Sequence, residues 1–418
     1  MTMISRSALA ASLAASLAAT LVGAPASAWA QVSATPPAPV PAAAPTTPKV
    51  TRADLAAAYM RVDAAYTQRE TAKTLPDSLR AQINRIVDRA ALSFFSGQFA
   101  AAVGTIDAAQ LQLSGVPVAS TPVASTPVAS TPVRGPRSLH GAPVSAARDE
   151  YLARLAGVDS TGPLAQALLS TRERARLLVD VPSPERSAEF LHDPATLSRD
   201  LAREVSVLER GRDPYIGLVG DFWRVYRGAN NALVPMRIVA PPSANVRKPV
   251  GVLLVLHGAG GDENMFVDAY GSGIVSKLAA EQRLILVSPR TDVFGVTPAH
   301  FDALMALLRN EFRIDSTRVY LIGHSMGAGA AARLVQARPA QFAAVAMLAG
   351  GSPITVPGAP PSLYVGAELD GIIPAARVEA AAKATPGAVY ELFRHEGHLL
   401  MVGNGVRRAV PWLVSHTR

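Results

Sequence analysis

Continuous apolar runs in the second half of the chain are the feature that most limits its fold. They read "VGVLLVLHG", "RLILVSP", "RVYLIGHS", "FAAVAMLAG", "PSLYVGAE" and "AVYELFRHE". Runs without polar alternation are typical of strands that are covered on both faces. Helical patterns separate them at 264–282, 298–312, 326–338 and 374–385. The alternation predicts an α/β fold with a mostly parallel, doubly covered sheet, preceded by an antiparallel pair at "FWRVYRG" and "ALVPMRIVAP".

One of these runs ends in the pentapeptide Gly323-His324-Ser325-Met326-Gly327, which has the form G-x-S-x-G. A serine on a sharp strand-to-helix turn exposes its hydroxyl, and the tight turn leaves no room for side chains two residues to either side. A helix-capping serine beside packing glycines is the alternative interpretation. The strand "RVYLI" before the serine and the helix-forming run "AGAAARLVQA" after it favour a nucleophile at Ser325.

A serine hydroxyl is a poor nucleophile without a base, and the base needs an orienting acid. In this sheet architecture the order along the chain is nucleophile, acid, base. Asp370 is the expected acid, because it lies in the loop after the strand in "LYVGAELDGIIP", and Glu368 is the alternative. The expected base is His398, in "HEGHLL" after the last strand, with His395 and His416 as alternatives.

Hydrolysis also needs two backbone N–H donors for the oxyanion. One is expected from Met326, directly after the nucleophile. The other is expected from Ala259, or next from Gly260, in the glycine-rich loop "HGAGGD". Packing under the turn is the alternative role for the side chains of Met326 and His257. The loop is neither G-x-G-x-x-G nor a Walker loop, so we predict no nucleotide cofactor.

Four segments in this order, "LLVLHGAGGDEN", "FRIDSTRVYLIGHSMGAGAA", "GAELDGIIP" and "EGHLL", resemble the α/β-hydrolase superfamily. They are most similar to secreted esterases of the feruloyl-esterase and polyhydroxybutyrate-depolymerase type, and to predicted peptidases near the prolyl oligopeptidases. The resemblance covers about residues 217–418. It implies the α/β-hydrolase fold, serine hydrolysis and no cofactor. Ser325, Asp370 and His398 are thus the expected catalytic residues, and we expect no metal site.

Three departures from these relatives bear on the substrate. "TDVFGVTPAH" is short, and no long insertion that could form a lid is evident, which favours an open site for a smaller or extended polar substrate. No propeller-like repeat precedes the hydrolase region, which counts against a true prolyl oligopeptidase. The chain has no cysteine, so it cannot match the disulfide-bridged depolymerases.

The N-terminus predicts export. One positive charge precedes the long apolar stretch "SALAASLAASLAATLVGAPASA", and two small-x-small sites follow it. We therefore expect a signal peptide over residues 1–30, cleaved before Gln31, and a periplasmic or extracellular protein. An uncleaved anchor is the alternative, although Gly23 and Pro25 break the segment. No stable membrane insertion is expected from the rest of the chain.

Between the signal peptide and the hydrolase region, the composition changes several times. A proline-rich linker at 31–50 is followed by a helical region at 51–115. The tandem PVAST units make 116–144 a low-complexity linker, and 145–216 is again helical. The segment "FFSGQFAAAVGTIDAA" is faintly similar to one tetratricopeptide unit, but an ordinary helical hairpin explains it better because it has no period. A protein partner for these helices is a possibility that the sequence leaves open.

The formal net charge of +8 comes almost entirely from arginines scattered among acidic residues. Without a basic run or interleaved aromatics, the charge does not indicate a nucleic-acid partner. We therefore expect an exported serine hydrolase that acts on a small-molecule or polymer ester. Peptide or amide cleavage by the same triad is one alternative. A non-catalytic binding or scaffold protein with a vestigial hydrolase domain is the other.

Overall fold

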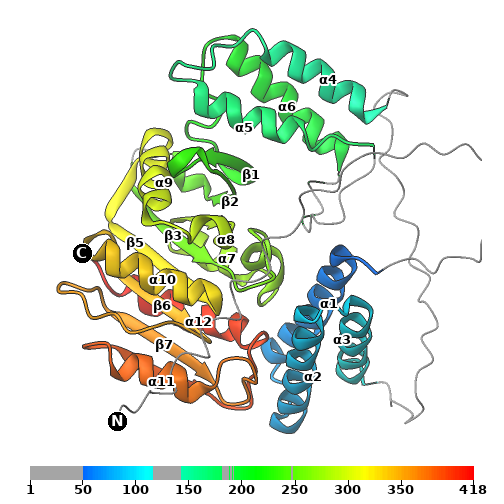
Figure 1. Ribbon diagram of the computed structural model, residues 1–418, viewed down its shortest axis with the longest axis vertical. Coiled ribbons are helices and arrows are strands. Elements are labelled where there is room, and N and C mark those ends of the chain that lie inside the picture. Colours follow the sequence, from blue (N-terminus) through cyan, green and yellow to red (C-terminus); the bar gives the residue numbers. More distant parts are fainter. Residues whose placement is uncertain (1–49, 116–142, 181–187, 189–190, 192, 246–247) are drawn as a thin grey trace, which may run out of the picture. The chain divides into compact units, whose positions relative to one another are not determined.

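The centre of the structure, a computed structural model, is a mixed sheet of eight strands in the order β1-β2-β4-β3-β5-β6-β7-β8 (Figure 1). The structure describes residues 50–115, 143–180, 188, 191, 193–245 and 248–418. The predicted signal peptide and nearly all of the two predicted linkers lie outside these residues. The described chain from Val50 onward is one compact unit. None of its helices combines the length and the apolar character needed to cross a bilayer.

The strands follow the apolar runs of the sequence. Their bounds are β1 Gly220–Arg227, β2 Leu233–Ala240, β3 Val250–Leu256, β4 Leu284–Pro289, β5 Ile314–His324, β6 Ala344–Leu348, β7 Ser362–Ala367 and β8 Val389–Phe393. The pairs β1/β2 and β2/β4 are antiparallel, and all the pairs from β4 through β3 to β8 are parallel. The predicted α/β class, its parallel sheet and the antiparallel pair before it are therefore confirmed.

Side chains of the central strands alternate between two hydrophobic cores, as the two-residue period of a strand requires. On β3, Val252 and Leu254 enter one core, whereas Leu253 and Val255 enter the other. The first core contains α9 (Pro298–Glu311), α10 (Met326–Ala337) and α11 (Ala375–Lys383); the second contains α7 (Ile274–Glu281) and α12 (Met401–Val414). Both faces of the sheet are thus covered by helices.

The six helices that the structure describes before the sheet also belong to these two cores. Their bounds are α1 Arg52–Thr71, α2 Asp77–Phe95, α3 Phe99–Leu113, α4 Val144–Leu155, α5 Ala165–Ala175 and α6 Pro194–Glu209. Buried residues of α1–α3 share the core of α7 and α12, and those of α4–α6 share the core of α9–α11. The sequence alone left open where these helices pack; the structure places them against opposite faces of the sheet.

Two details differ from the sequence-based prediction. The helix expected at 264–282 is interrupted: a π-helical turn at Met265–Ala269 is followed by left-handed backbone at 271–273 before α7 begins. A Cβ on Gly273 would lie 1.9 Å from the Val267 carbonyl oxygen, so only glycine fits there. Helix α12, at the C-terminus, was not predicted. Short helical turns complete the fold: α8 Thr291–Phe294, η2 Ala229–Asn231, η3 Pro242–Asn245 and η5 Pro339–Gln341.

Candidate active site

Ser325 stands on the turn between β5 and α10, with φ of 54° and ψ of −117°. This positive φ is disfavoured for a residue with a side chain, so the surrounding packing must hold it. A Cβ at Gly323 would lie 2.4 Å from the Gly327 carbonyl oxygen, and one at Gly327 would lie 2.0 Å from that of Leu256. The two glycines of the pentapeptide are therefore steric requirements of the turn.

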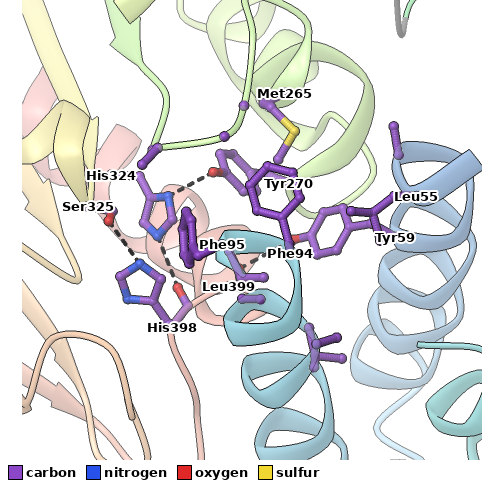
Figure 2. A pocket seen from close by; sticks show the side chains of 18 of the residues that line it. Leu55, Tyr59, Phe94, Phe95, Met265, Tyr270, His324, Ser325, His398 and Leu399 are labelled. Carbon is purple, nitrogen blue, oxygen red and sulfur yellow. Dashed lines mark hydrogen bonds between the residues drawn. The ribbon is translucent and has the colours of Figure 1, made fainter. Parts of the chain in front are cut away.

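The turn brings Ser325 to the two residues expected to assist it. The His398 Nε2 lies 2.9 Å from the Ser325 Oγ (Figure 2). The His398 Nδ1 lies 2.7 Å from the Asp370 Oδ2. His398 and Asp370 are 3% and 7% exposed, so water competes little for these contacts. The arrangement can take the hydroxyl proton of Ser325 onto the histidine ring while a carboxylate supports the resulting imidazolium.

The orientation of the Asp370 carboxylate is determined by its own loop. Its Oδ1 accepts hydrogen bonds from the backbone N–H groups of Ile372, at 2.8 Å, and Ile373, at 2.7 Å. The Oδ2 is thereby left for the His398 Nδ1–H. With its proton on Nδ1, the imidazole presents Nε2 as an acceptor to the Ser325 hydroxyl, which is the tautomer that general-base catalysis needs.

The alternative acid and bases lie in other environments. Glu368 pairs with Arg394 and accepts a hydrogen bond from the His395 backbone N–H at 2.8 Å. The His395 ring is 3.7 Å from the Glu368 carboxylate. His416 follows α12, where its ring contacts the Trp412 ring at a centroid distance of 4.5 Å. Among the described residues, the structure assembles only the combination of Ser325, His398 and Asp370 as a hydrogen-bonded triad.

The glycine-rich loop after β3 lies beside the nucleophile. A Cβ on Gly258 would be 3.2 Å from that of Ser325, and Ala259 and Gly260 are exposed and line the same pocket. The Arg52 guanidinium of α1 donates to the carbonyl oxygens of Gly260, at 2.5 Å, and Gly261, at 3.1 Å. Met326 begins α10, so its N–H has no partner within the helix. These positions suit the two donors that we expect.

Two buried histidines support the site without taking part in the triad. The His257 Nδ1–H donates to the Gly258 carbonyl at 2.9 Å, and its Nε2 accepts from the Thr291 N–H at 2.9 Å. The His324 Nε2–H donates to the His398 carbonyl at 3.0 Å, and its Nδ1 accepts from the Tyr270 hydroxyl at 2.8 Å (Figure 2). Burial lowers the pKa of both rings, so both are neutral packing and hydrogen-bonding groups.

An apolar pocket with a cavity volume of about 120 Å³ opens onto Ser325. Figure 2 shows Leu55 and Tyr59 of α1 and Phe94 of α2 opposite the serine, with Met265 above them. The mostly apolar lining differs from the polar substrate that the sequence favoured. The wall over the serine does not come from an insertion in the hydrolase region; it comes from helices that lie more than two hundred residues earlier in the chain.

The strand order, the helices on both faces and the nucleophile on a strand-to-helix turn decide the architecture. The chain has the α/β-hydrolase fold. Within the described residues, no group of three or more acidic or histidine side chains is arranged to hold a metal ion.

Comparison with known proteins gives similarity in structure only. No family model and no curated protein sequence matches the chain. Among solved structures, a thermostable esterase is similar over 47% of this chain and 63% of its own, less than two thirds, with 19% identity and a TM-score of 0.38. An S-formylglutathione hydrolase from Agrobacterium tumefaciens is similar over 48% and 97%, with 17% identity and a TM-score of 0.39. Another from Staphylococcus aureus is similar over 47% and 99%, with 16% identity and a TM-score of 0.39.

Several polar residues near the triad belong to no motif of the sequence. They are buried, they lie on helices or just before His398, and they hydrogen-bond to one another or to the His398 loop: Tyr66, Asn84, Asp88 and Glu396. Asn84 and Asp88 are one helical turn apart on the buried side of α2. Two polar residues at this spacing on an otherwise apolar helix face were the available signal.

Proposed function

We propose that this protein is a serine hydrolase that cleaves carboxylic esters. The observation that carries the proposal is the continuous hydrogen-bonded line from Ser325 through His398 to Asp370, in which each atom has the role the reaction needs. The Ser325 oxygen forms a bond to the ester carbonyl carbon while its proton passes to the His398 Nε2. The backbone N–H groups of Met326 and Ala259 hold the oxyanion.

The second half of the reaction releases the acyl group. The C–O bond to the alcohol breaks as His398 returns its proton to the leaving oxygen, leaving an acyl group on Ser325. Water then attacks the same carbonyl, His398 takes its proton, and the Ser325 oxygen leaves with that proton. Asp370 keeps the imidazole oriented and stabilises its charged form throughout.

We place the acyl part of the substrate in the pocket between the glycine-rich loop and α1–α2. Aliphatic and aromatic side chains form its walls, so an apolar acyl group gains the free energy of leaving water. Extended peptides are usually held by main-chain hydrogen bonds, which these apolar walls do not supply. The pocket therefore favours esters over peptides, and an apolar acyl group over a polar one.

Ester and anilide substrates of matched acyl length test this function. Purified protein should hydrolyse p-nitrophenyl esters, with kcat/KM rising from acetate through butyrate to a longer chain, and should cleave the anilides far more slowly. A fluorophosphonate should label the wild type and a Ser415→Ala control, whose exposed serine lies after α12, but not Ser325→Ala. Anilide turnover equal to ester turnover would favour the peptidase, and an unlabelled, folded wild type would contradict the hydrolase.

We also propose that the protein acts outside the cytoplasm. The apolar segment and the small-x-small sites before Gln31 support this, and they lie outside the described residues. N-terminal sequencing of the exported protein should begin at Gln31. A chain that retains residues 1–30 in the membrane fraction would indicate the anchor instead.

A further inference from the structure

The loop that carries His398 is held by the N-terminal helix α2. The Asp88 carboxylate accepts the His398 backbone N–H through both of its oxygens, at 3.0 and 2.8 Å, and the Leu399 N–H at 3.4 Å. The Asn84 Oδ1 accepts the Gly397 N–H at 2.8 Å. Three successive backbone donors of the loop are thus bound by two side chains that stand one turn apart on one helix.

The residue at the start of this loop is anchored in the same place. Glu396 is 2% exposed, and its carboxylate accepts hydrogen bonds from the Tyr66 hydroxyl at 2.8 Å and the Arg80 guanidinium at 3.1 Å. The Asn84 amide and the Asn404 amide complete the set, at 3.2 and 2.8 Å. A buried carboxylate this well satisfied fixes the loop to α1 and α2.

The sheet itself offers this loop little support. The loop follows β8, the last strand in the sheet order, so β7 is the only strand beside β8 within the described residues. The position of the His398 ring relative to Ser325 therefore depends on contacts beyond the sheet. On one side the His324 ring holds the His398 carbonyl, and on the other Asp88 holds its N–H.

We propose that Asp88 is a positioning residue for the hydrolysis and acts through the backbone of His398. Helix α2 therefore contributes to the active site by holding the catalytic histidine in place. This inference rests on the proposed function. Asp88 does not line the pocket, although its neighbour Val87 does. Its removal should therefore change how His398 meets Ser325 without changing the walls that bind the acyl group.

The contact also explains the glycine at 397. A Cβ there would lie 2.7 Å from the Asp88 Oδ2 and 3.0 Å from its Cγ. Gly397 has no positive φ, so alanine is compatible with its backbone and the obstacle is the carboxylate. Gly397→Ala should push Asp88 off the loop, which gives a second perturbation of the same contact from the opposite side.

The test compares kcat and KM for the best p-nitrophenyl ester. Displacing a catalytic group by about 1 Å costs about 100-fold in rate, so Asp88→Ala should lower kcat by about 10- to 100-fold while KM stays within about threefold. The same loss should appear in the rate of fluorophosphonate labelling. Asp88→Asn, which keeps one acceptor oxygen for the His398 N–H, should recover part of kcat. If Asp88→Ala does not fold, Asp88→Asn and Gly397→Ala carry the test.

A double-mutant cycle separates positioning from general stability. Gly397→Ala should lower kcat in the wild type but have little effect in the Asp88→Ala background, because the atom it meets is gone. Asp63 on α1 is the matched control: its buried carboxylate accepts the N–H groups of Gly271, at 3.1 Å, and Ser272, at 2.7 Å. Asp63→Asn should change the melting temperature, in a direction that depends on pH, and leave kcat within about threefold.

Two results would overturn the inference: a folded Asp88→Ala that keeps wild-type kcat, or equal losses of kcat in the Asp88 and Asp63 variants. Both are distinct from failure of the proposed function itself. If the proposed function is wrong, the protein would show no esterase turnover and no fluorophosphonate labelling with any residue at position 88.

Discussion

Replacing Asp370 by asparagine should disable the triad through the tautomer of His398. The two backbone donors of Ile372 and Ile373 point at one oxygen of residue 370. An asparagine must turn its carbonyl oxygen toward them, since its NH2 group cannot accept. The NH2 then faces the His398 Nδ1, which can receive that hydrogen bond only as an acceptor. The ring proton then lies on Nε2, and a protonated Nε2 cannot accept the proton of the Ser325 hydroxyl.

The size of the effect follows from the loss of the general base. In a triad where only the tautomer is wrong, kcat falls about 10⁴-fold, which corresponds to about 5 kcal/mol of barrier. Because asparagine is nearly isosteric and keeps the hydrogen bonds to Ile372 and Ile373, KM and the melting temperature should change little. The loss should appear in kcat for every ester, independent of acyl length.

Steady-state kinetics with a p-nitrophenyl ester measures this, with Glu368→Gln as the control. Glu368 is the other carboxylate of the same loop, and it pairs with Arg394 away from the serine. Its variant should keep kcat within about threefold, as expected for an exposed ion pair. An Asp370→Asn variant within tenfold of the wild type would refute the tautomer argument, and an equal loss in Glu368→Gln would refute the choice of acid.

Three further predictions concern stability. Arg224 and Glu311 form a fully buried ion pair. Arg224→Met should therefore lower the free energy of unfolding, measured in urea, by about 3 to 5 kcal/mol, and adding Glu311→Leu should recover most of that loss. An Arg224→Met variant as stable as the wild type would contradict this. Gly327→Ala should prevent folding because its Cβ meets the Leu256 carbonyl. Gly329→Ala, whose nearest neighbour is an Arg333 nitrogen 3.6 Å away, should raise the melting temperature slightly. Burial raises the pKa of Asp63 to about 7. Between about pH 4 and 7 the folded state therefore holds a proton that the unfolded chain has lost. The unfolding free energy of the wild type should fall relative to that of Asp63→Asn as pH rises through this window, by up to about 4 kcal/mol; a constant difference would show that Asp63 is charged throughout.

The fold and the nucleophile could be predicted because local residue patterns encode them. A strand covered on both faces needs apolar residues without alternation, as in "VGVLLVL", and the turn at Ser325 excludes side chains at Gly323 and Gly327. The order of nucleophile, acid and base along the chain, with the place of each loop after its strand, then favoured Asp370 as the acid and His398 as the base, and left Glu368, His395 and His416 as alternatives. These constraints are either local residue patterns or the order of strands and helices along the chain. A single sequence shows both kinds.

The pocket wall and the support of His398 were decided only in three dimensions. The apolar side of α1 and α2 indicates that these helices are buried, but not against which surface, and both faces of the sheet are apolar. The contact between Asp88 and His398 joins residues 310 positions apart. In the sequence, an aspartate on a helix is typical of a solvent-facing position, and only the packing of α2 on the loop after β8 turns it into a buried acceptor. The sequence by itself thus determined the fold class and the candidate nucleophile, acid and base. The tertiary structure alone decided what surrounds them, because complementarity between distant surfaces leaves no periodic trace in the chain.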